Sequence, residues 1–321
     1  MSAAEQTIEY QPVKPWISHL AFPMVTLTFY SVQALLALSV YKGWIWLMIP
    51  LVLVASHLMH GLLIGFHEAT HGSLRKGRLM NEIDGVLLGI GSYISFTLYR
   101  VTHQTHHMHL AGEKDVELWP FVDPTKPRWA RRLAAFIELN FGMVFTPFLF
   151  WRVFFKRDSP IRNKRVRRKI WIEGAATVLF WAVTYYIVAR FNLWQFFLWN
   201  YFIPGFIAAN LQSWRKYIEH VGLNGNTSKS ATRSIVANTW LGRVFSVTLL
   251  HEPLHGVHHI KRNIPHGDLP EHVDKLLPEA NDEIPPFPHY RAALVHLFSR
   301  LWDPQVGGQW TRELGEKTEA P

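Results

Sequence analysis

Long apolar runs alternate with charged and polar segments along this 321-residue chain. Two apolar runs, 19–41 and 44–66, follow each other closely near the start, and two more, 170–189 and 194–212, do so in the second half. Each run has about the 20 residues that an α-helix needs to cross the hydrocarbon core of a bilayer. Each pair must form an antiparallel hairpin, because its connecting link is so short. The pattern predicts an all-α, polytopic membrane protein with four transmembrane helices.

The segments between the two hairpins are predicted to be helical without crossing the membrane. Residues 75–100 carry apolar positions among glycines and charges, which is typical of an amphipathic helix lying at the interface. Residues 133–155 are apolar but include Glu138 and Arg152, so this segment is interpreted as a second interfacial or half-buried helix.

We expect the whole chain, residues 1–321, to form a single membrane domain. In this prediction, residues 67–169 and 213–300 form a helical cap outside the bilayer that holds a di-metal site. Residues 311–321 are expected to be a disordered tail, because they are charged and lack apolar spacing.

The distribution of positive charge predicts the orientation of the chain. Eighteen of the 33 Lys and Arg residues lie between Phe66 and Ile170, whereas the short links hold only Lys42 and Arg190. By the positive-inside rule, both termini and the cap are cytoplasmic. Cytoplasmic loops and anionic head groups account for the net charge of +9, so nucleic acid is not expected as a partner.

Three clusters of histidines stand out in the polar segments. They are His67 and His71; His103, His106 and His107; and His255, His258 and His259. At offsets of three and four residues, the rings of each cluster lie on one face of a helix. Eight imidazoles suit two metal ions better than one, because one ion needs about four ligands. The chain has no cysteine, so thiolate ligands are excluded. Imidazole suits zinc, copper and nickel as well as iron, and oxidative chemistry would favour iron.

Three further residues are candidates at such a site. His220 comes shortly after the fourth apolar run and is a ninth candidate ligand. Glu219 beside it is expected to orient an imidazole through the ring nitrogen that does not bind metal. His251 precedes Pro253, which fits the first position of a helix, so His251 is expected outside that helix, as an outer partner or on the surface. The remaining late histidines are expected on the surface: His266, His272, His289 and His296.

The three clusters resemble the histidine boxes of the integral-membrane fatty acid desaturase and hydroxylase family, which read His-x-x-x-His, His-x-x-His-His and a later His-x-x-His-His. The resemblance covers roughly residues 45–275. Asp115 and Glu117 follow the second box much as acidic residues do in family members. Arg215 with the pair Glu219-His220 is similar to an element of many bacterial members.

The resemblance implies a membrane-bound enzyme that uses dioxygen and two iron ions (Fe2+/Fe3+) to introduce a double bond into an acyl lipid. Electrons would come from a separate ferredoxin or cytochrome-type protein, because no such domain is fused to the chain. Asp115, Glu219 and His251 would be outer partners of the metal ligands. The expected location is a bacterial inner membrane. The implied iron ligands are His67, His71, His103, His106, His107, His220, His255, His258 and His259.

Several alternatives stay open at this point. A hydroxylase or ketolase of a lipid or carotenoid would carry the same di-iron site, and the sequence His251-Glu-Pro-Leu-His255 departs from the common asparagine-containing third box. The stretch from His67 to His71 also fits His-Glu-x-x-His, the pattern of a zinc metalloprotease with Glu68 as general base. That reading leaves the two later boxes unexplained. A metal transporter would need more polar residues in the spans.

Overall fold

A computed structural model describes residues 8–310, and within this range the chain is helical, with two isolated β-bridges and no β-strand. The chain forms two compact units. The first, which we call the histidine unit, contains the residues up to His19, Thr102–Ile137 and the residues from Trp214 onward. The second, which we call the hairpin unit, contains Leu20–Val101 and Glu138–Ser213. The tail predicted at 311–321 lies outside the described residues.

Four of the described helices are long and apolar enough to cross a membrane, as an integral membrane protein requires. They are α2 (Ala21–Lys42), α3 (Ile45–His71), α6 (Arg128–Phe155) and α7 (Lys164–Arg190). Three of the predicted spans, 19–41, 44–66 and 170–189, coincide with α2, α3 and α7. Each apolar run therefore became a helix where its composition predicted one.

The segment 194–212 differs from its predicted form. It falls within α8 (Trp194–Phe197), a π-helical turn η1 (Leu198–Phe202) and α9 (Ile203–His220), and is not among the four apolar helices. A π-turn replaces part of the α-helical ladder. In addition, α9 continues into polar residues that end at His220, so its average composition is less apolar.

The helix α6 also differs from its prediction, because the whole of it qualifies as a span and not only as an interfacial helix. It is kinked at Phe141, whose backbone angles are not helical. The Asn210 side chain accepts a hydrogen bond from the Gly142 amide at 2.9 Å and donates one to the Asn140 carbonyl at 3.1 Å. Backbone groups freed by the kink are thus satisfied by a side chain, as an apolar environment demands.

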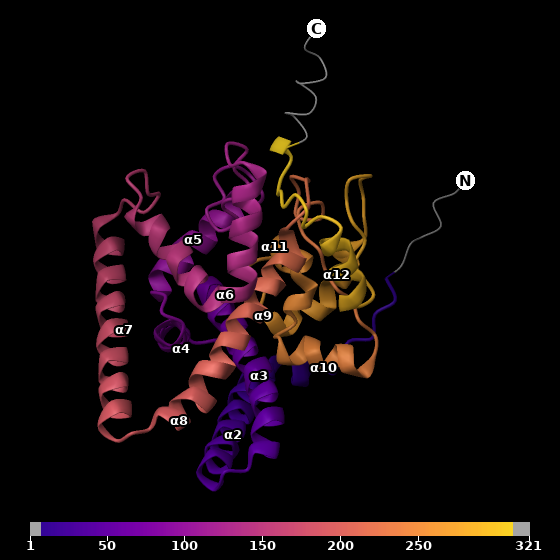
Figure 1. The fold of residues 1–321 in the computed structure, drawn as a ribbon. Helices are drawn as coiled ribbons and strands as arrows, with labels where there is room; N and C mark the ends of the chain where they lie inside the picture. Colours follow the sequence, from indigo (N-terminus) through magenta and orange to yellow (C-terminus); the bar gives the residue numbers. More distant parts are fainter. Residues whose placement is uncertain (1–7, 311–321) are drawn as a thin grey trace. The chain divides into compact units, whose positions relative to one another are not determined.

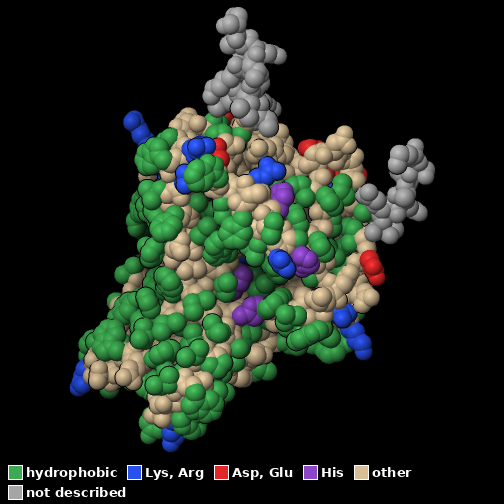
Figure 2. Space-filling model, turned by 45° about the vertical axis from the view of Figure 1, so that its right-hand side comes forward, with side chains coloured by type: hydrophobic (Ala, Val, Ile, Leu, Met, Phe, Trp, Pro, Cys, Tyr) green, Lys and Arg blue, Asp and Glu red, His purple; other side chains and the backbone are tan. Residues whose placement is uncertain are grey.

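Within the hairpin unit, α2 and α3 lie antiparallel and in contact along their lengths (Figure 1). The link between them is tight because Gly43 adopts a left-handed conformation with φ 69°. The amphipathic helix α4 (Arg78–Gly91) packs on both α3 and α7 and leaves several apolar side chains exposed. The lower part of the face in Figure 2, where α2 and α3 lie, is covered mainly by hydrophobic side chains.

A buried carboxylate fixes the start of α5 (Phe96–Met108), the helix that carries the second histidine box. Glu173 of α7 accepts hydrogen bonds from the Ser95 hydroxyl at 2.6 Å, the Thr97 hydroxyl at 2.7 Å and the Thr97 amide at 2.8 Å. A negative charge at this position satisfies a free amide and complements the helix dipole.

The histidine unit is built from short helices. Around the third box these are η2 (Glu252–Leu254), α11 (His255–Ile260) and η3 (His266–Leu276). The first of these begins where Leu250 and His251 both have positive φ, and Pro253 follows in the first turn. A core beneath α11 holds it in place, formed by Val236, Leu254, Val257, Leu269, Val273 and Leu276. The helices α1 (Pro15–His19), α10 (Trp240–Thr248) and α12 (Tyr290–Phe298) also lie in this unit.

Candidate metal centre

The second histidine box is oriented by two carboxylates from the loop that follows α5. His106 Nδ1 lies 2.7 Å from Asp115 Oδ2, and His103 Nδ1 lies 2.9 Å from Glu117 Oε2. Asp115 is itself fixed, because it accepts hydrogen bonds from the amides of Ala111 at 3.1 Å and Glu117 at 3.1 Å. Each carboxylate therefore accepts a hydrogen bond from an Nδ1–H group, and the lone pair of the ring is on Nε2.

The third box is oriented in the same way by a residue three positions earlier. His255 Nδ1 lies 2.9 Å from Glu252 Oε1, across the junction of η2 and α11. His220, at the end of α9, uses a main-chain acceptor instead, with its Nδ1 at 3.1 Å from the carbonyl oxygen of Ala231. In both rings the lone pair is again on Nε2.

The Nε2 atoms of these rings collect in two groups within the histidine unit. In the first group, His255 Nε2 lies 2.8 Å from His220 Nε2 and 3.0 Å from His259 Nε2. His106 belongs to the same group, because ligand atoms of His106, His220 and His259 all lie within 4.8 Å of one another. In the second group, His107 Nε2 lies 3.0 Å from His103 Nε2 and 3.1 Å from His258 Nε2. The groups adjoin, with the rings of His107 and His259 at 4.3 Å.

These separations are unfavourable unless a cation lies between the nitrogens. In His220 and His255, Nδ1–H donates to an oxygen acceptor, so the lone pair of each neutral ring is on Nε2. At 2.8 Å, these two lone pairs would face each other and repel. Nitrogens that share one metal at a metal–nitrogen distance of about 2.0–2.1 Å lie roughly 3 Å apart. The donor set and its spacing therefore fit two metal ions held mainly by imidazole.

The pKa values of two of the rings, His220 and His259, favour the neutral, metal-binding form. Burial lowers the pKa of His220 and His259 well below that of free imidazole, and the charge of neighbouring imidazoles lowers it further. For His106, burial also acts to lower the pKa, but the charge and hydrogen bond of Asp115 outweigh it and raise the pKa overall. Asp115 would stabilise positive charge on this ring, whether a proton or a metal supplies it.

An arginine lies behind the first group of nitrogens. Arg215 Nη1 donates to both oxygens of Glu219, at 2.8 and 2.6 Å, and also to Glu252 Oε1. Glu219 Oε2 lies 3.6 Å from His255 Nε2. Glu219 therefore faces the nitrogen proposed to bind metal, whereas the sequence predicted a contact with the other ring nitrogen. Burial raises the pKa of both carboxyls, and Arg215 opposes this by favouring their charged forms. Arg215 thus fixes Glu252, which fixes His255.

The first histidine box lies in the hairpin unit, on the last turn of α3. The rings of His67 and His71 are 5.3 Å apart, as expected for positions i and i+4, and His67 is buried. Glu68 Oε1 lies 3.5 Å from His67 Nδ1, and Glu68 Oε2 accepts a hydrogen bond from Ser73 at 2.8 Å. Glu68 therefore lies beside the first box, but farther from Nδ1 than the carboxylates of the other two boxes. Gly72, with φ 76°, ends the helix directly after His71.

Two other histidines are more buried than a surface position would be. His251 lies directly before η2, outside that helix as predicted. His251 is fully buried, and within the described residues its hydrogen bond goes from Nδ1 to the Ser246 hydroxyl at 2.9 Å, not to a box histidine. His266 was predicted to be a surface residue, but only 4% of it is exposed. It is buried because η3 packs closely against α1 and α11.

Glu252 was missed in the sequence analysis as an orienting residue, and Glu117 was noticed only for its resemblance to family members. A usable signal existed for Glu252, because it precedes His255 by three residues and so lies on the same helical face. No such signal existed for Ala231, whose carbonyl orients His220 across a loop.

Comparison with known proteins is consistent with this geometry. A sequence profile for fatty acid desaturases matches residues 44–291, which include all three histidine boxes. A chloroplastic sn-2 acyl-lipid omega-3 desaturase (ferredoxin) of Helianthus annuus is 30% identical over 110 residues. This alignment covers 33% of the present chain and 25% of the relative. The profile match extends over well more than half of the chain, and the chain belongs to the fatty acid desaturase family.

Proposed function

We propose that this protein is a dioxygen-dependent, di-iron acyl-lipid desaturase that introduces a double bond into an alkyl chain. The observation that carries the proposal is the pairing of Nε2 atoms at 2.8–3.1 Å in two adjoining groups. In four of these rings Nδ1 lies at an oxygen acceptor. Family membership supports an oxidoreductase. Zinc has no redox chemistry, so a redox-active metal such as iron suits this reaction.

We assign the ligands of the two irons as follows. His106, His220, His255 and His259 provide four nitrogens for one iron. The other iron is assigned to the group formed by His103, His107 and His258, with His67 and His71 as further ligands. The last two are assigned from the three-box pattern of the family.

The chain's own residues prepare this centre. Asp115, Glu117 and Glu252 hold the Nδ1–H protons, which fixes the tautomer of each ring and raises its basicity as a ligand. The ligand rings are largely buried, which excludes bulk water from the reacting groups. When bound, iron supplies the oxidation of an unactivated methylene by dioxygen and two electrons.

A lipid substrate and a separate electron donor are part of the proposal. The substrate class is supported by family membership and by the relative whose name gives an acyl lipid. That relative is named with ferredoxin, and we propose a ferredoxin or cytochrome-type protein as the donor here. We also propose that both termini and the metal centre face the cytoplasm of a bacterial cell, as the positive-inside rule favours.

The test combines metal analysis of the detergent-purified protein with mass spectrometry of lipids from expressing and control cells. The expected result is two irons per chain and a lipid species about 2 Da lighter, because desaturation removes two hydrogens. A lipid species about 16 Da heavier would show that the protein is a hydroxylase and not a desaturase. Zinc without iron and unchanged lipids would overturn the proposal in favour of the hydrolase built on His67 to His71.

A further inference from the structure

The start of α7 holds an unusual concentration of positive charge directly beside an apolar surface. Five of the six residues from Lys164 to Lys169 are Lys or Arg, and the apolar part of the span begins at Ile170. With a rise of 1.5 Å per residue, the last charge lies within one helical turn of the first exposed apolar side chains. This is the arrangement expected where a helix enters a membrane.

These charges differ in their partners. Arg167 donates to the carbonyls of Phe154 at 3.3 Å and Ile161 at 3.1 Å, so it has a structural role. Lys169 pairs with Glu82 at 3.0 Å. The side chains of Lys164 and Arg168 make no hydrogen bond or ion pair with any residue in the described range 8–310. They are four residues apart on one helical face, where like charges repel each other.

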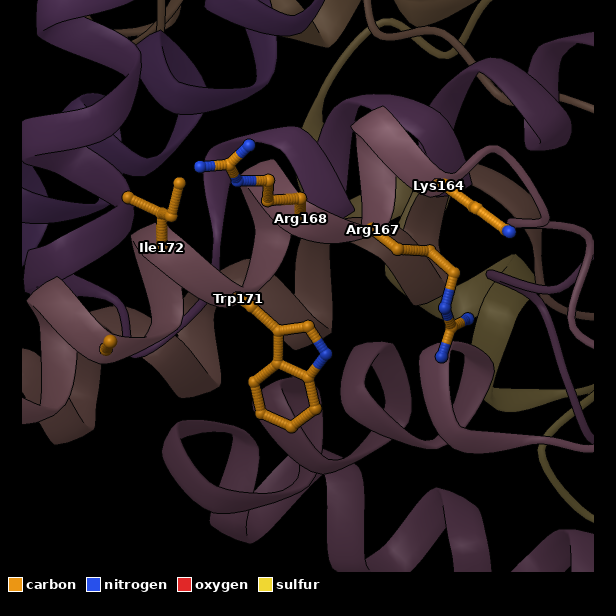
Figure 3. A pocket seen from close by; sticks show the side chains of 6 residues that line it. Lys164, Arg167, Arg168, Trp171 and Ile172 are labelled. Atoms are coloured by element: carbon orange, nitrogen blue, oxygen red, sulfur yellow. The ribbon is translucent and has the colours of Figure 1, made fainter.

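Lys164 and Arg168 line a shallow groove on the exposed face of α7, with a volume of about 480 Å³. In Figure 3, Arg168 and Ile172 are directed to one side of the helix and Arg167 and Trp171 to the other, while Lys164 extends away from Arg168 at the start of the helix. The groove therefore runs between two i, i+4 ridges of one helix. Its first part is cationic, and its continuation is apolar.

The apolar part is exposed and rigid. Trp171 is 53% exposed and Ile172 59%. The Trp171 ring packs against Phe154 and Phe155, with centroid distances of 5.5 and 5.7 Å, so it is held in place without being covered. Further along the helix, Leu179 continues the exposed apolar surface. From Arg168 to Leu179 the track measures roughly 16 Å, about the thickness of the hydrocarbon of one leaflet.

We propose that this groove binds an anionic phospholipid. The head-group phosphate lies over the cationic part of the groove, where Lys164 and Arg168 supply positive charge that no acidic side chain of the described residues pairs. An acyl chain follows the groove past Trp171 and Ile172. Charge complementarity selects an anionic head group over a zwitterionic one. The groove shares no residue with the proposed metal centre, and the lipid bound there is not the one oxidised.

Native mass spectrometry of the purified, metal-loaded protein in detergent tests this, with phosphatidylglycerol, phosphatidylcholine or inorganic phosphate added. We expect phosphatidylglycerol to bind and the other two to bind far more weakly. The double variant Lys164→Ala/Arg168→Ala should bind phosphatidylglycerol about 30-fold more weakly, which corresponds to about 1 kcal/mol for each cation. Arg157→Ala/Arg162→Ala removes the same charge from exposed positions outside the groove and should bind normally.

Three results would overturn the proposal. If phosphatidylcholine bound as tightly as phosphatidylglycerol, the two cations would not select the lipid. If both double variants lost the same affinity for phosphatidylglycerol, the effect would come from net charge and not from the groove. Equal binding of inorganic phosphate would show an anion site without lipid selectivity. Binding is measured without turnover, so failure here leaves the proposed desaturation untouched, and failure of desaturation leaves this test valid.

Discussion

His220 Nε2 and His255 Nε2 lie 2.8 Å apart, although the Nδ1 atom of each ring is already used toward an oxygen acceptor. The two rings come from segments 35 residues apart. A metal ion held by both nitrogens would replace this repulsive contact by two coordinate bonds. The close approach of the two rings therefore depends on the acceptors that hold their Nδ1 atoms.

Replacing His220 or His255 by alanine should remove iron from the first group of nitrogens and reduce turnover by at least about 100-fold, more than loss of an outer partner usually costs. Iron content and lipid products of the purified variants check this. His109→Ala is the matched control, because His109 lies two residues beyond the second box and is exposed. Normal iron content in His255→Ala would contradict the ligand assignment.

Glu252→Ala should lower iron affinity about 10- to 100-fold, because the His255 ring loses the acceptor that fixes its tautomer. Glu252→Gln should lose less, since its amide oxygen can still accept the Nδ1–H. Iron retention during titration with a chelator measures both. If Glu252 contributed only to stability, both variants would unfold at a lower temperature but would bind iron with the same affinity.

The metal-free protein should become less stable as the pH falls from about 7 to 4. Burial lowers the pKa of His251 to about 3 and that of His266 to about 4, and nearby histidine charges add to the effect. In the unfolded chain these rings titrate near 6.5, so below that pH the unfolded state binds more protons, and acid favours unfolding.

Thermal unfolding of the metal-free protein across this pH range checks the expectation. His266→Gln should reduce the pH dependence of the unfolding temperature between pH 6.5 and 4, whatever its effect at neutral pH. The exposed control His109→Gln should keep the full dependence. An unchanged slope in His266→Gln would show that His266 is not neutral in the folded state.

Glu173→Ala should destabilise the hairpin unit by about 3 kcal/mol, because three hydrogen bonds to a buried carboxylate are lost at the start of α5. Iron content should fall with it, since α5 carries the second box. Glu173→Gln keeps an oxygen acceptor, so its stability and iron content should lie between those of the wild type and of Glu173→Ala. The unfolding temperature and the iron content measure the two effects, and a silent alanine variant would refute the capping role.

The absence of cysteine allows a direct test of membrane orientation. We expect Lys114→Cys to be protected from a membrane-impermeant maleimide in intact cells and Lys42→Cys to react, because the positive-inside rule places the first short link outside. Both side chains are exposed. Reaction of Lys114→Cys before cell lysis, with protection of Lys42→Cys, would reverse the proposed orientation.

The sequence alone predicted the helical class, three of the spans and the metal-binding residue types. These features are local: apolar runs determine where a helix can cross a membrane, and offsets of three and four residues place imidazoles on one face. The spacing of the boxes could therefore be interpreted without knowing what packs against them. The kink in α6 could not be foreseen, because Asn210 satisfies its backbone from another helix.

Tertiary structure decided which nitrogen faces the other rings in His103, His106, His220 and His255. His220 is oriented by the carbonyl of Ala231, His103 by Glu117 across a loop, and Arg215 holds Glu252 from another helix. Tautomer and ring direction depend on which acceptor reaches Nδ1, and that acceptor is brought there by packing, not by spacing along the chain. For this reason the sequence identified the candidate ligands, while only the folded chain divided those of the second and third boxes, with His220, into two groups.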